Sequence, residues 1–202
     1  MATYKIGYFI GSLAKESINR KLSQALIRLA PKELEFTEIP IRDLPLYSYD
    51  FDADYPAEGR ALKDAIEAAD GILFISPEYN RSIPGALKNA IDWGSRPWGT
   101  NSFARKPAGI IGASPGNIGT AVMQSSMRAV LSFLDAPQLN SPEAYVKFDA
   151  AVFGPNGEIN DESVESFLRH YMDEYGAFVQ RVLDANAPGH IGDRGTVTLP
   201  DS

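Results

Sequence analysis

The residues of this sequence that could do chemistry are short polar side chains and main-chain groups, and no acid–base pair stands out. The densest set is Pro-Glu-Tyr-Asn at 77–80, which follows the apolar run 71–75 and precedes a helix pattern. Because prolines restrict the backbone on either side, we expect the peptide groups of Glu78, Tyr79 and Asn80 to face outward. Such an edge can hydrogen-bond along a flat heteroaromatic ring. The alternative interpretation is a strand, a turn and a helix that bind nothing.

A second polar segment, 11–20, lies between the apolar run 4–10 and the next helix pattern. The start of a helix offers unpaired N–H groups and the positive end of its dipole, which suit a phosphate. The segment contains short hydroxyl and amide side chains and a nearby charge, namely Ser12, Ser17, Asn19 and Lys15. The alternative is that Ser17 only caps the helix.

A third segment, 112–120, is rich in small residues, among them Ser114 and Gly116. Glycine lets a ligand approach the backbone closely, although glycine-rich loops occur in many folds. Segment 11–20 has neither the Walker pattern nor the Gly-x-Gly-x-x-Gly fingerprint, so we expect neither a nucleotide triphosphatase nor a Rossmann dehydrogenase. It fits one phosphate better than a pyrophosphate.

The composition argues against several classes of function. The 202 residues carry a formal net charge of -7, and a nucleic-acid partner is not expected because phosphate neutralisation needs a basic face. Cysteine is absent, and His170 and His190 lack the spacing of a metal site, so we expect no metal and no thiol chemistry. Any redox chemistry must therefore come from a bound organic cofactor.

Apolar stretches are short throughout. None approaches the length that spans a bilayer, so no membrane partner is expected. The run near the N-terminus covers about five residues before Gly11 and Ser12 and is too short for a signal peptide. The simplest expectation is a cytoplasmic protein.

Alternating apolar runs and helical patterns predict an α/β fold. We expect strands over 4–10, 34–39, 71–76 and 107–113 and within 138–147. The expected helices cover 19–29, 58–69, the stretch that ends near 93, 120–134 and a last helix capped by Asn160 or Asp161. Segment 43–56 is predicted to be an extended surface loop. Residues 1–186 would form one domain, and 187–202, which lack periodicity, a loosely ordered tail.

Five strands alternating with helices make a doubly wound parallel sheet with helices on both faces. We expect the flavodoxin-like strand order 2-1-3-4-5, in which the first, third and fourth strands end side by side around the ligand-binding switch point. The three polar segments would then line one crevice.

The longest motifs also carry a family resemblance. They are Gly-Ser-Leu-x-x-x-Ser-x-Asn-Arg at 11–20, Pro-Glu-Tyr-Asn-x-Ser-Ile-Pro-Gly-x-Leu-Lys-Asn-Ala-Ile-Asp-Trp at 77–93, and the loop at Ser114. Together they resemble the NADPH-dependent FMN reductase family, nearest to its soluble quinone and chromate reductases, over about residues 4–183. The resemblance implies a flavodoxin-like fold with non-covalent FMN and NADPH or NADH as co-substrate. It also implies electron transfer to quinones or other small acceptors, such as flavins, azo compounds, chromate or other metal ions.

Site residues follow from the same resemblance. The FMN phosphate would be held by Ser12, Lys15, Ser17 and Asn19, with Ile18 in the same turn. The isoalloxazine would be bordered by Pro77, Glu78, Tyr79 and Asn80, and the ribityl side by Ser114 and Gly116. The sequence has Ala14 where the family commonly has arginine and Glu16 where glycine is frequent, so one charge partner of the phosphate is missing.

The chemistry would belong to the cofactor, so we nominate no catalytic side chain, Glu78 included. The family usually forms dimers or tetramers, and a contact surface could be built from Trp93, Arg96, Pro97 and Trp98. The alternative is that these residues form a local cluster that covers the end of the helix. One alternative is a flavodoxin-like FMN electron carrier without nicotinamide turnover. Another is a receiver module, which needs acidic residues where Gly11 and Ser76 stand.

Overall fold

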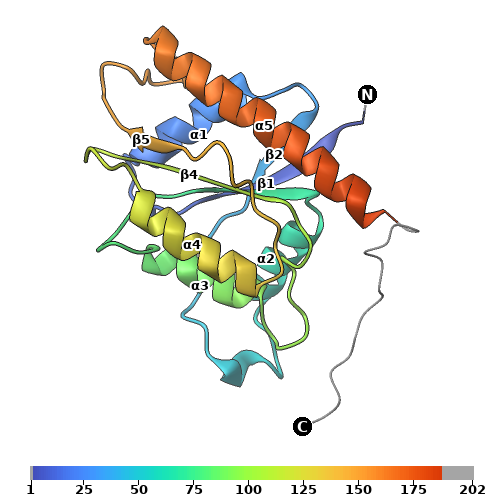
Figure 1. Cartoon of the computed structure of the whole chain (residues 1–202). Coiled ribbons are helices and arrows are strands. Elements are labelled where there is room, and N and C mark those ends of the chain that lie inside the picture. Colours follow the sequence, from blue (N-terminus) through green and yellow to red (C-terminus); the bar gives the residue numbers. More distant parts are fainter. Residues whose placement is uncertain (1, 188–202) are drawn as a thin grey trace.

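Five short apolar runs pair side by side into one parallel sheet. The computed structural model describes residues 2–187, and Figure 1 shows the sheet between two layers of helices. The strands are β1 (Tyr4–Ile10), β2 (Leu34–Glu38), β3 (Gly71–Ile75), β4 (Ala108–Ser114) and β5 (Tyr145–Lys147). Their order is β2-β1-β3-β4-β5 and every neighbouring pair is parallel, which confirms the expected flavodoxin-like topology.

The helices fill the crossovers between these strands. They are α1 (Ile18–Leu29), α2 (Ala57–Glu67), α3 (Gly85–Gly94), α4 (Ala121–Phe133) and α5 (Glu162–Asn186). One face of the sheet is covered by α1 and α5, and the other by α2, α3 and α4. All five fall where the periodicity predicts them. Asp161 is the cap of α5, because its side chain accepts from the N–H of Val164.

The sheet separates two hydrophobic cores. All five residues of β3 are buried, as expected for a central parallel strand covered on both faces. On the α2–α4 face, the rings of Phe9 and Phe74 stack with centroids 5.2 Å apart. On the α1 and α5 face, fully buried Tyr171 and Tyr175 pack with the leucines of α1.

The segment between β2 and α2 is more ordered than a plain surface loop. It contains a short 3-10 turn, Tyr49–Phe51, and three of its aromatic rings surround Trp93: those of Tyr47, Phe51 and Tyr55. The indole N–H of Trp93 donates to the carbonyl of Pro45 at 2.7 Å. Trp93 is completely buried, so its expected place in a contact surface is wrong.

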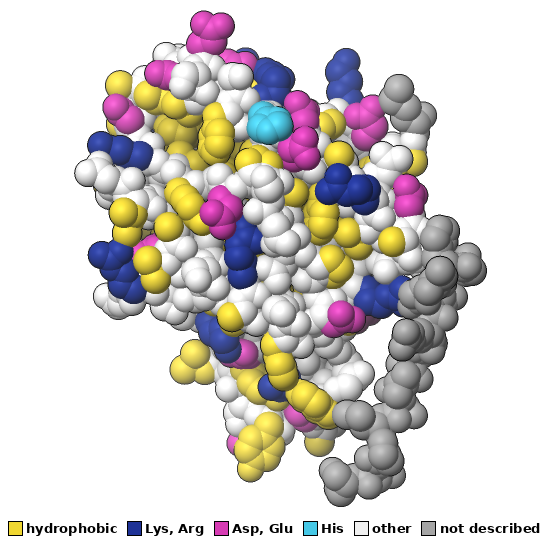
Figure 2. Space-filling model, viewed as in Figure 1, with side chains coloured by type: hydrophobic (Ala, Val, Ile, Leu, Met, Phe, Trp, Pro, Cys, Tyr) yellow, Lys and Arg dark blue, Asp and Glu magenta, His cyan; other side chains and the backbone are white. Residues whose placement is uncertain are grey.

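The rest of that expected surface lies outside the core. Trp98 is 68% exposed, while Arg96 and Pro97 are half-buried. His170 lies on the exposed side of α5, whereas His190 and the expected tail from 188 onward fall outside the described residues. Within residues 2–187, no helix has the length and apolar character needed to cross a membrane. Figure 2 shows acidic and basic side chains interspersed over one face, so an anionic ligand depends on local groups.

Candidate functional site

The carboxyl ends of β1, β3 and β4 touch one another directly. Gly11 donates its N–H to the carbonyl of Ile75 at 2.9 Å. A Cβ added at Gly11 would lie 2.2 Å from the Ser76 hydroxyl oxygen, and one at Gly112 would lie 2.0 Å from the Ser76 carbonyl oxygen. Two glycines are therefore required for three strand ends to meet around Ser76. This contact confirms that the three polar segments begin side by side.

The loop between β1 and α1 presents unpaired donors. The main-chain N–H groups of Glu16, Ile18 and Asn19 have no acceptor within the described residues. Ser17 is buried and caps α1, because its hydroxyl oxygen accepts from the N–H of Arg20 at 3.4 Å. An accepting hydroxyl keeps its own proton, so capping leaves Ser17 free to donate to a ligand.

The other predicted residues of this loop differ in accessibility. Ser12 is buried and its hydroxyl accepts from the N–H of Ala14, while Lys15 is exposed and Ile18 is half-buried. Asn19 is 1% exposed, and its side-chain amide bonds both the N–H and the carbonyl of Ala113 at 2.9 Å. Asn19 therefore ties α1 to β4, and only one hydrogen of its amide remains for another partner.

Arg20 is committed elsewhere. Its guanidinium forms two 2.8 Å hydrogen bonds with the carboxylate of Glu38 at the end of β2. The bonds from Arg20 hold the pKa of the Glu38 carboxyl below its usual value. Arg20 is the last residue of the motif at 11–20. Because its charge is already paired with Glu38, it leaves no unpaired positive charge for a ligand at this loop.

The loop after β3 is a tight hairpin turn. Tyr79 and Ser82 exchange both main-chain hydrogen bonds, at 3.1 and 3.0 Å, and the two residues between them have positive φ angles, 50° at Asn80 and 63° at Arg81. The expectation that the Tyr79 peptide faces outward is therefore wrong for its N–H, which the turn consumes. The N–H groups of Glu78 and Asn80 have no acceptor within residues 2–187. Pro77 is buried beneath them.

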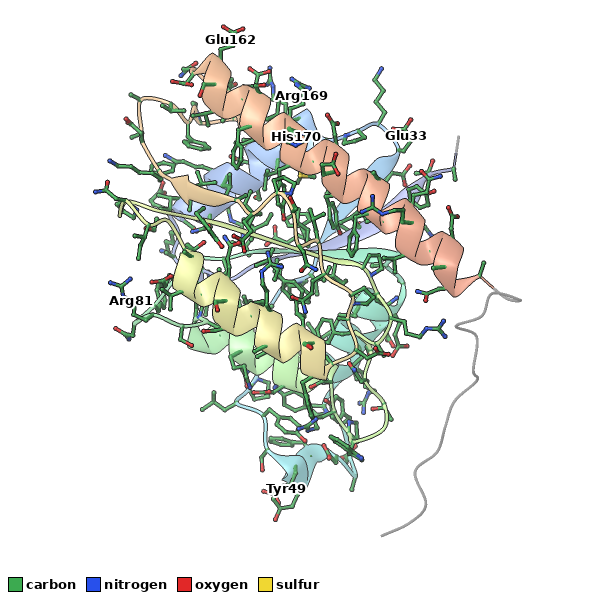
Figure 3. The ribbon with its side chains drawn as sticks, viewed as in Figure 1. Glu33, Tyr49, Arg81, Glu162, Arg169 and His170 are labelled. Atoms are coloured by element: carbon green, nitrogen blue, oxygen red, sulfur yellow. The ribbon has the colours of Figure 1, made fainter. Side chains whose placement is uncertain are left out.

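The carboxylate of Glu78 points at α4. One of its oxygens accepts from the N–H groups of Val122 at 3.1 Å and Met123 at 3.0 Å. The Glu78 side chain is only 10% exposed, and the guanidinium of Arg81 lies 3.7 Å away. Figure 3 shows Arg81 itself directed outward near the start of α4. Glu78 therefore caps a helix, and only its peptide group is left to border a ligand.

The loop after β4 is held from both sides. The Ser114 hydroxyl accepts from the N–H of Gly116 at 3.0 Å, and its carbonyl accepts from Phe148. Ser114 is half-buried and Gly116 is exposed, so both remain accessible to a ligand. At the start of α4, Gln124 is completely buried and its amide bonds the Thr120 hydroxyl and the Ala144 carbonyl.

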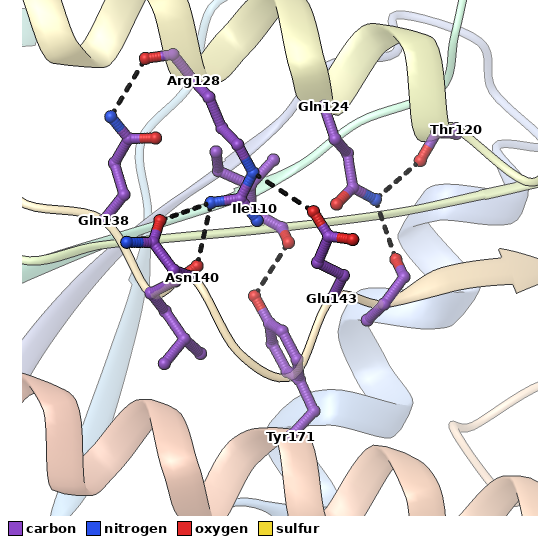
Figure 4. A network of polar contacts seen from close by, with 10 residues as sticks. Ile110, Thr120, Gln124, Arg128, Gln138, Asn140, Glu143 and Tyr171 are labelled. Atoms are coloured by element: carbon purple, nitrogen blue, oxygen red, sulfur yellow. Dashed lines mark hydrogen bonds and ion pairs between the residues drawn. The ribbon is translucent and has the colours of Figure 1, made fainter.

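Figure 4 shows how further contacts fix α4 against the connection to β5. Arg128 donates to the carbonyl of Leu139 and to the side chain of Asn140, both at 3.1 Å. Tyr171 of α5 reaches through to the carbonyl of Ile110 at 2.9 Å. The contacts of Gln124 and Tyr171 are buried, and they lie on either side of β4, the strand that ends at Ser114.

The donors on this edge fit FMN. A phosphate suits the free N–H groups at 16–19 and the Ser17 hydroxyl, and a flat ring suits the free N–H groups of Glu78 and Asn80. Among residues 2–187, no cluster of three or more His, Asp or Glu side chains could hold a metal ion.

The sequence pattern does not indicate Arg42, which the structure places at this edge of the sheet. Arg42 donates to the carbonyl of Leu13 at 2.6 Å and so lies beside the loop between β1 and α1. The sequence pattern predicts binding loops only at the ends of the first, third and fourth strands. The end of β2 lies at the same edge of the sheet, next to β1, and this neighbour relation is the signal that could have indicated Arg42.

Known proteins resemble this chain over most of its length. The family described as NADPH-dependent FMN reductase matches residues 4–151. A 2-hydroxy-1,4-benzoquinone reductase from Burkholderia sp. is 48% identical over 176 residues, which are 87% of this chain and 96% of that protein. A quinone reductase from Pseudomonas putida is 43% identical over 178 residues, 88% of this chain and 95% of the relative.

A solved structure agrees. FerB, a flavoenzyme NAD(P)H:(acceptor) oxidoreductase from Paracoccus denitrificans, superimposes with a TM-score of 0.86 at 41% identity, covering 89% of this chain and 98% of FerB. Sequence identity, strand order and the convergence of three polar loops point to the same conclusion. The chain belongs to the NADPH-dependent FMN reductase family.

Proposed function

We propose that this protein is a flavoenzyme that oxidises NAD(P)H and reduces small quinones through FMN bound at the carboxyl ends of β1, β3 and β4. The observation that carries the proposal is the meeting of three donor-bearing loops around Ser76, made possible by Gly11 and Gly112. Ligands of open α/β sheets bind at this position. Bound FMN would supply the redox chemistry, taking a hydride from NAD(P)H and passing electrons to the acceptor.

The protein's own part is orientation and electrostatics. The N–H groups at 16–19 and the hydroxyl of Ser17 would bind the phosphate, with Ser12, Lys15 and Asn19 completing the loop. The free N–H groups of Glu78 and Asn80 would hydrogen-bond the edge of the ring above Pro77, and Tyr79 would lie beside it. Fixed donors of this kind stabilise negative charge that develops next to them. Ser114 and Gly116 would bound the ribityl side.

Quinones are the proposed acceptor class. Two relatives at 43% identity or more are described as a quinone reductase and a 2-hydroxy-1,4-benzoquinone reductase. A small planar acceptor suits a site whose walls are main chain and one half-exposed tyrosine, Tyr79. Flavins, azo compounds and chromate remain secondary candidates for the same open site.

A steady-state assay tests the activity. Purified protein reconstituted with FMN should oxidise NADPH or NADH when menadione is present, and the quinone should be consumed in equal amount. A protein that binds FMN yet oxidises neither nicotinamide would instead be an electron carrier. The candidate acceptors, namely quinones, flavins, azo compounds and chromate, can then be ranked by the rate at which each reoxidises the reduced enzyme in stopped-flow experiments.

Ser17→Asp tests the phosphate loop. Aspartate caps helices as well as serine does, so the fold should persist, while its charge repels the phosphate. FMN should bind on the order of tenfold more weakly or worse, because like charges in contact cost more than 1 kcal/mol. Riboflavin binding, measured by the same fluorescence titration, should not change. An unaltered FMN dissociation constant would show that the phosphate binds elsewhere.

We also propose a homodimer or homotetramer and a cytoplasmic location. Four large side chains are strongly exposed: Leu46, Tyr49, Trp98 and Phe133. Aromatic residues and arginine are enriched at interfaces, and Arg96 lies 5.5 Å from the ring centre of Trp98. Cell fractionation tests the location.

A further inference from the structure

The proposed phosphate loop is short of positive charge. Lys15 and Glu16 are both exposed and carry opposite charges, and Ala14 between Leu13 and Lys15 carries none. Arg20 is bound bidentately by Glu38, so its charge is already paired. An FMN phosphate carries close to two negative charges at neutral pH. The loop and the residues next to it in sequence therefore leave most of that charge uncompensated.

Arg42 brings a guanidinium to this loop from a different part of the chain. It follows the end of β2, and its Nη2 donates to the carbonyl of Leu13 at 2.6 Å. Its neighbour Ile41 is buried, and Leu44 packs against the same core, so the backbone around Arg42 is anchored. The contact fixes the side chain one residue away from Ala14.

The charge of Arg42 is not neutralised by the protein. No carboxylate of the described chain lies within 4.0 Å of its guanidinium; the five ion pairs in this part involve other residues. A guanidinium has five N–H donors, and the bond to Leu13 uses one. The remaining donors match the geometry of a phosphate, which arginine can bind in a bidentate manner.

We propose that Arg42 is the cation that compensates the FMN phosphate and makes the site prefer FMN over riboflavin. This inference rests on the proposed function, because it needs a phosphate at the loop between β1 and α1. The exposed position of Arg42 makes its contribution moderate and sensitive to salt. Only a ligand that carries the phosphate can benefit from it.

The test titrates the quenching of flavin fluorescence and compares FMN with riboflavin in the unmodified protein and in four variants. Arg42→Gln removes the charge but keeps an amide that can donate to Leu13. It should weaken FMN binding about fivefold at low salt, as expected for the loss of roughly 1 kcal/mol. Riboflavin should bind as it does to the unmodified protein. Arg42→Lys keeps the charge without the planar fork and should lose less than Arg42→Gln.

Two controls complete the design. Arg181→Gln removes an equal charge from α5, near the opposite end of the sheet, where neighbouring Val179 packs on Gly71 at the start of β3. It should leave FMN binding unchanged. Adding Ala14→Arg to Arg42→Gln places a cation beside the same loop and should restore most of the lost affinity. The difference between FMN and riboflavin should shrink as salt rises from 0.01 M to about 1 M.

The outcomes separate this inference from the proposed function. If the unmodified protein binds FMN and riboflavin equally, the phosphate site itself is wrong. If it prefers FMN and Arg42→Gln keeps the whole preference at low salt, Arg42 has no part in it. If Arg42→Gln weakens both ligands alike while unfolding at the same urea concentration, Arg42 acts on the loop conformation and the charge argument fails.

Discussion

Glu78 shows how one side chain can look catalytic in a sequence and serve structure in the folded chain. A carboxylate beside a proposed flavin ring suggests a general base. In the structure this carboxylate accepts two N–H groups at the start of α4 and is nearly buried. A carboxylate at a helix N-terminus also gains from the helix dipole. Glu78 therefore joins the loop after β3 to the loop after β4, the two walls proposed for the ring.

Replacing Glu78 should cost stability and leave the chemistry intact. Glu78→Ala removes the cap and should lower the free energy of unfolding by about 1 to 2 kcal/mol. Glu78→Gln keeps an acceptor oxygen and should lose less. Urea denaturation measures both. If Glu78→Gln changed the shape of the pH profile for NADPH oxidation, the carboxylate would be an acid or base after all.

Gly112 provides a prediction with a control in the same chain. A methyl group at Gly112 would lie 2.0 Å from the Ser76 carbonyl oxygen, which is backbone and cannot move aside. Gly112→Ala should therefore destabilise the protein by about 1 to 3 kcal/mol and weaken FMN binding. Gly85→Ala, in the first turn of α3, meets no atom within 4 Å and should be neutral or slightly stabilising. Thermal unfolding and FMN titration of both variants check this contrast.

The helix α1 is positioned by polar contacts on two sides. Asn19 bonds the main chain of Ala113 in β4, and Arg20 bonds Glu38 at the end of β2. Two consecutive residues of α1 thus bond β4 and β2, the strands that lie on the two sides of the central pair β1 and β3. These contacts fix the position of the first turn of α1, which presents the N–H groups proposed to bind the phosphate.

The pair of Arg20 and Glu38 should make stability depend on pH. The pKa of Glu38 is lowered in the folded protein, so its contribution is present above its unfolded pKa and is lost as the pH falls through the folded value. Because the two side chains are 44% and 34% exposed, the contribution is about 0.5 kcal/mol. Glu38→Gln should thus be less stable at pH 7 and equally stable near pH 2. A difference that grew on acidification would contradict this sign.

At the scale of the whole molecule, two large aromatic side chains are exposed next to each other. Trp98 and Phe133 are 68% and 69% exposed, and their ring centres lie 6.4 Å apart. Phe133 is the last residue of α4, and Trp98 lies in the connection between α3 and β4. If this pair lies in the proposed oligomer interface, polar replacements must weaken assembly.

Light scattering coupled to size-exclusion chromatography tests that prediction, because it measures the mass of the protein in solution. Trp98→Ser combined with Phe133→Ser should shift the protein toward monomer, because each large aromatic side chain buries substantial apolar area in an interface. Phe167→Ser on α5, which is 39% exposed, serves as a matched control and should leave the mass unchanged. A variant pair with the mass of the unmodified protein would remove these two residues from the interface.

Much of the architecture could be predicted from local patterns. Strand and helix positions follow from apolar periodicity, and alternation of the two leads to a parallel sheet with a known switch point. The positions of segments 11–20, 77–80 and 112–120 at the ends of β1, β3 and β4 therefore needed no tertiary information. The absence of cysteine likewise excluded chemistry by a protein thiol.

Tertiary structure decided which groups are free to bind. Whether a side chain is available to a ligand depends on long-range partners that spacing along the sequence does not reveal. The polar groups of Asn19 and Glu78 are both largely occupied by hydrogen bonds to residues more than 40 positions away in sequence. Burial of Trp93 required the aromatic residues of 47–55 to fold back over α3. The sequence by itself determined where the strands end and where the loops that follow them lie. Only the packed fold could place Arg42 against Leu13, because proximity between distant segments arises from the arrangement of whole strands.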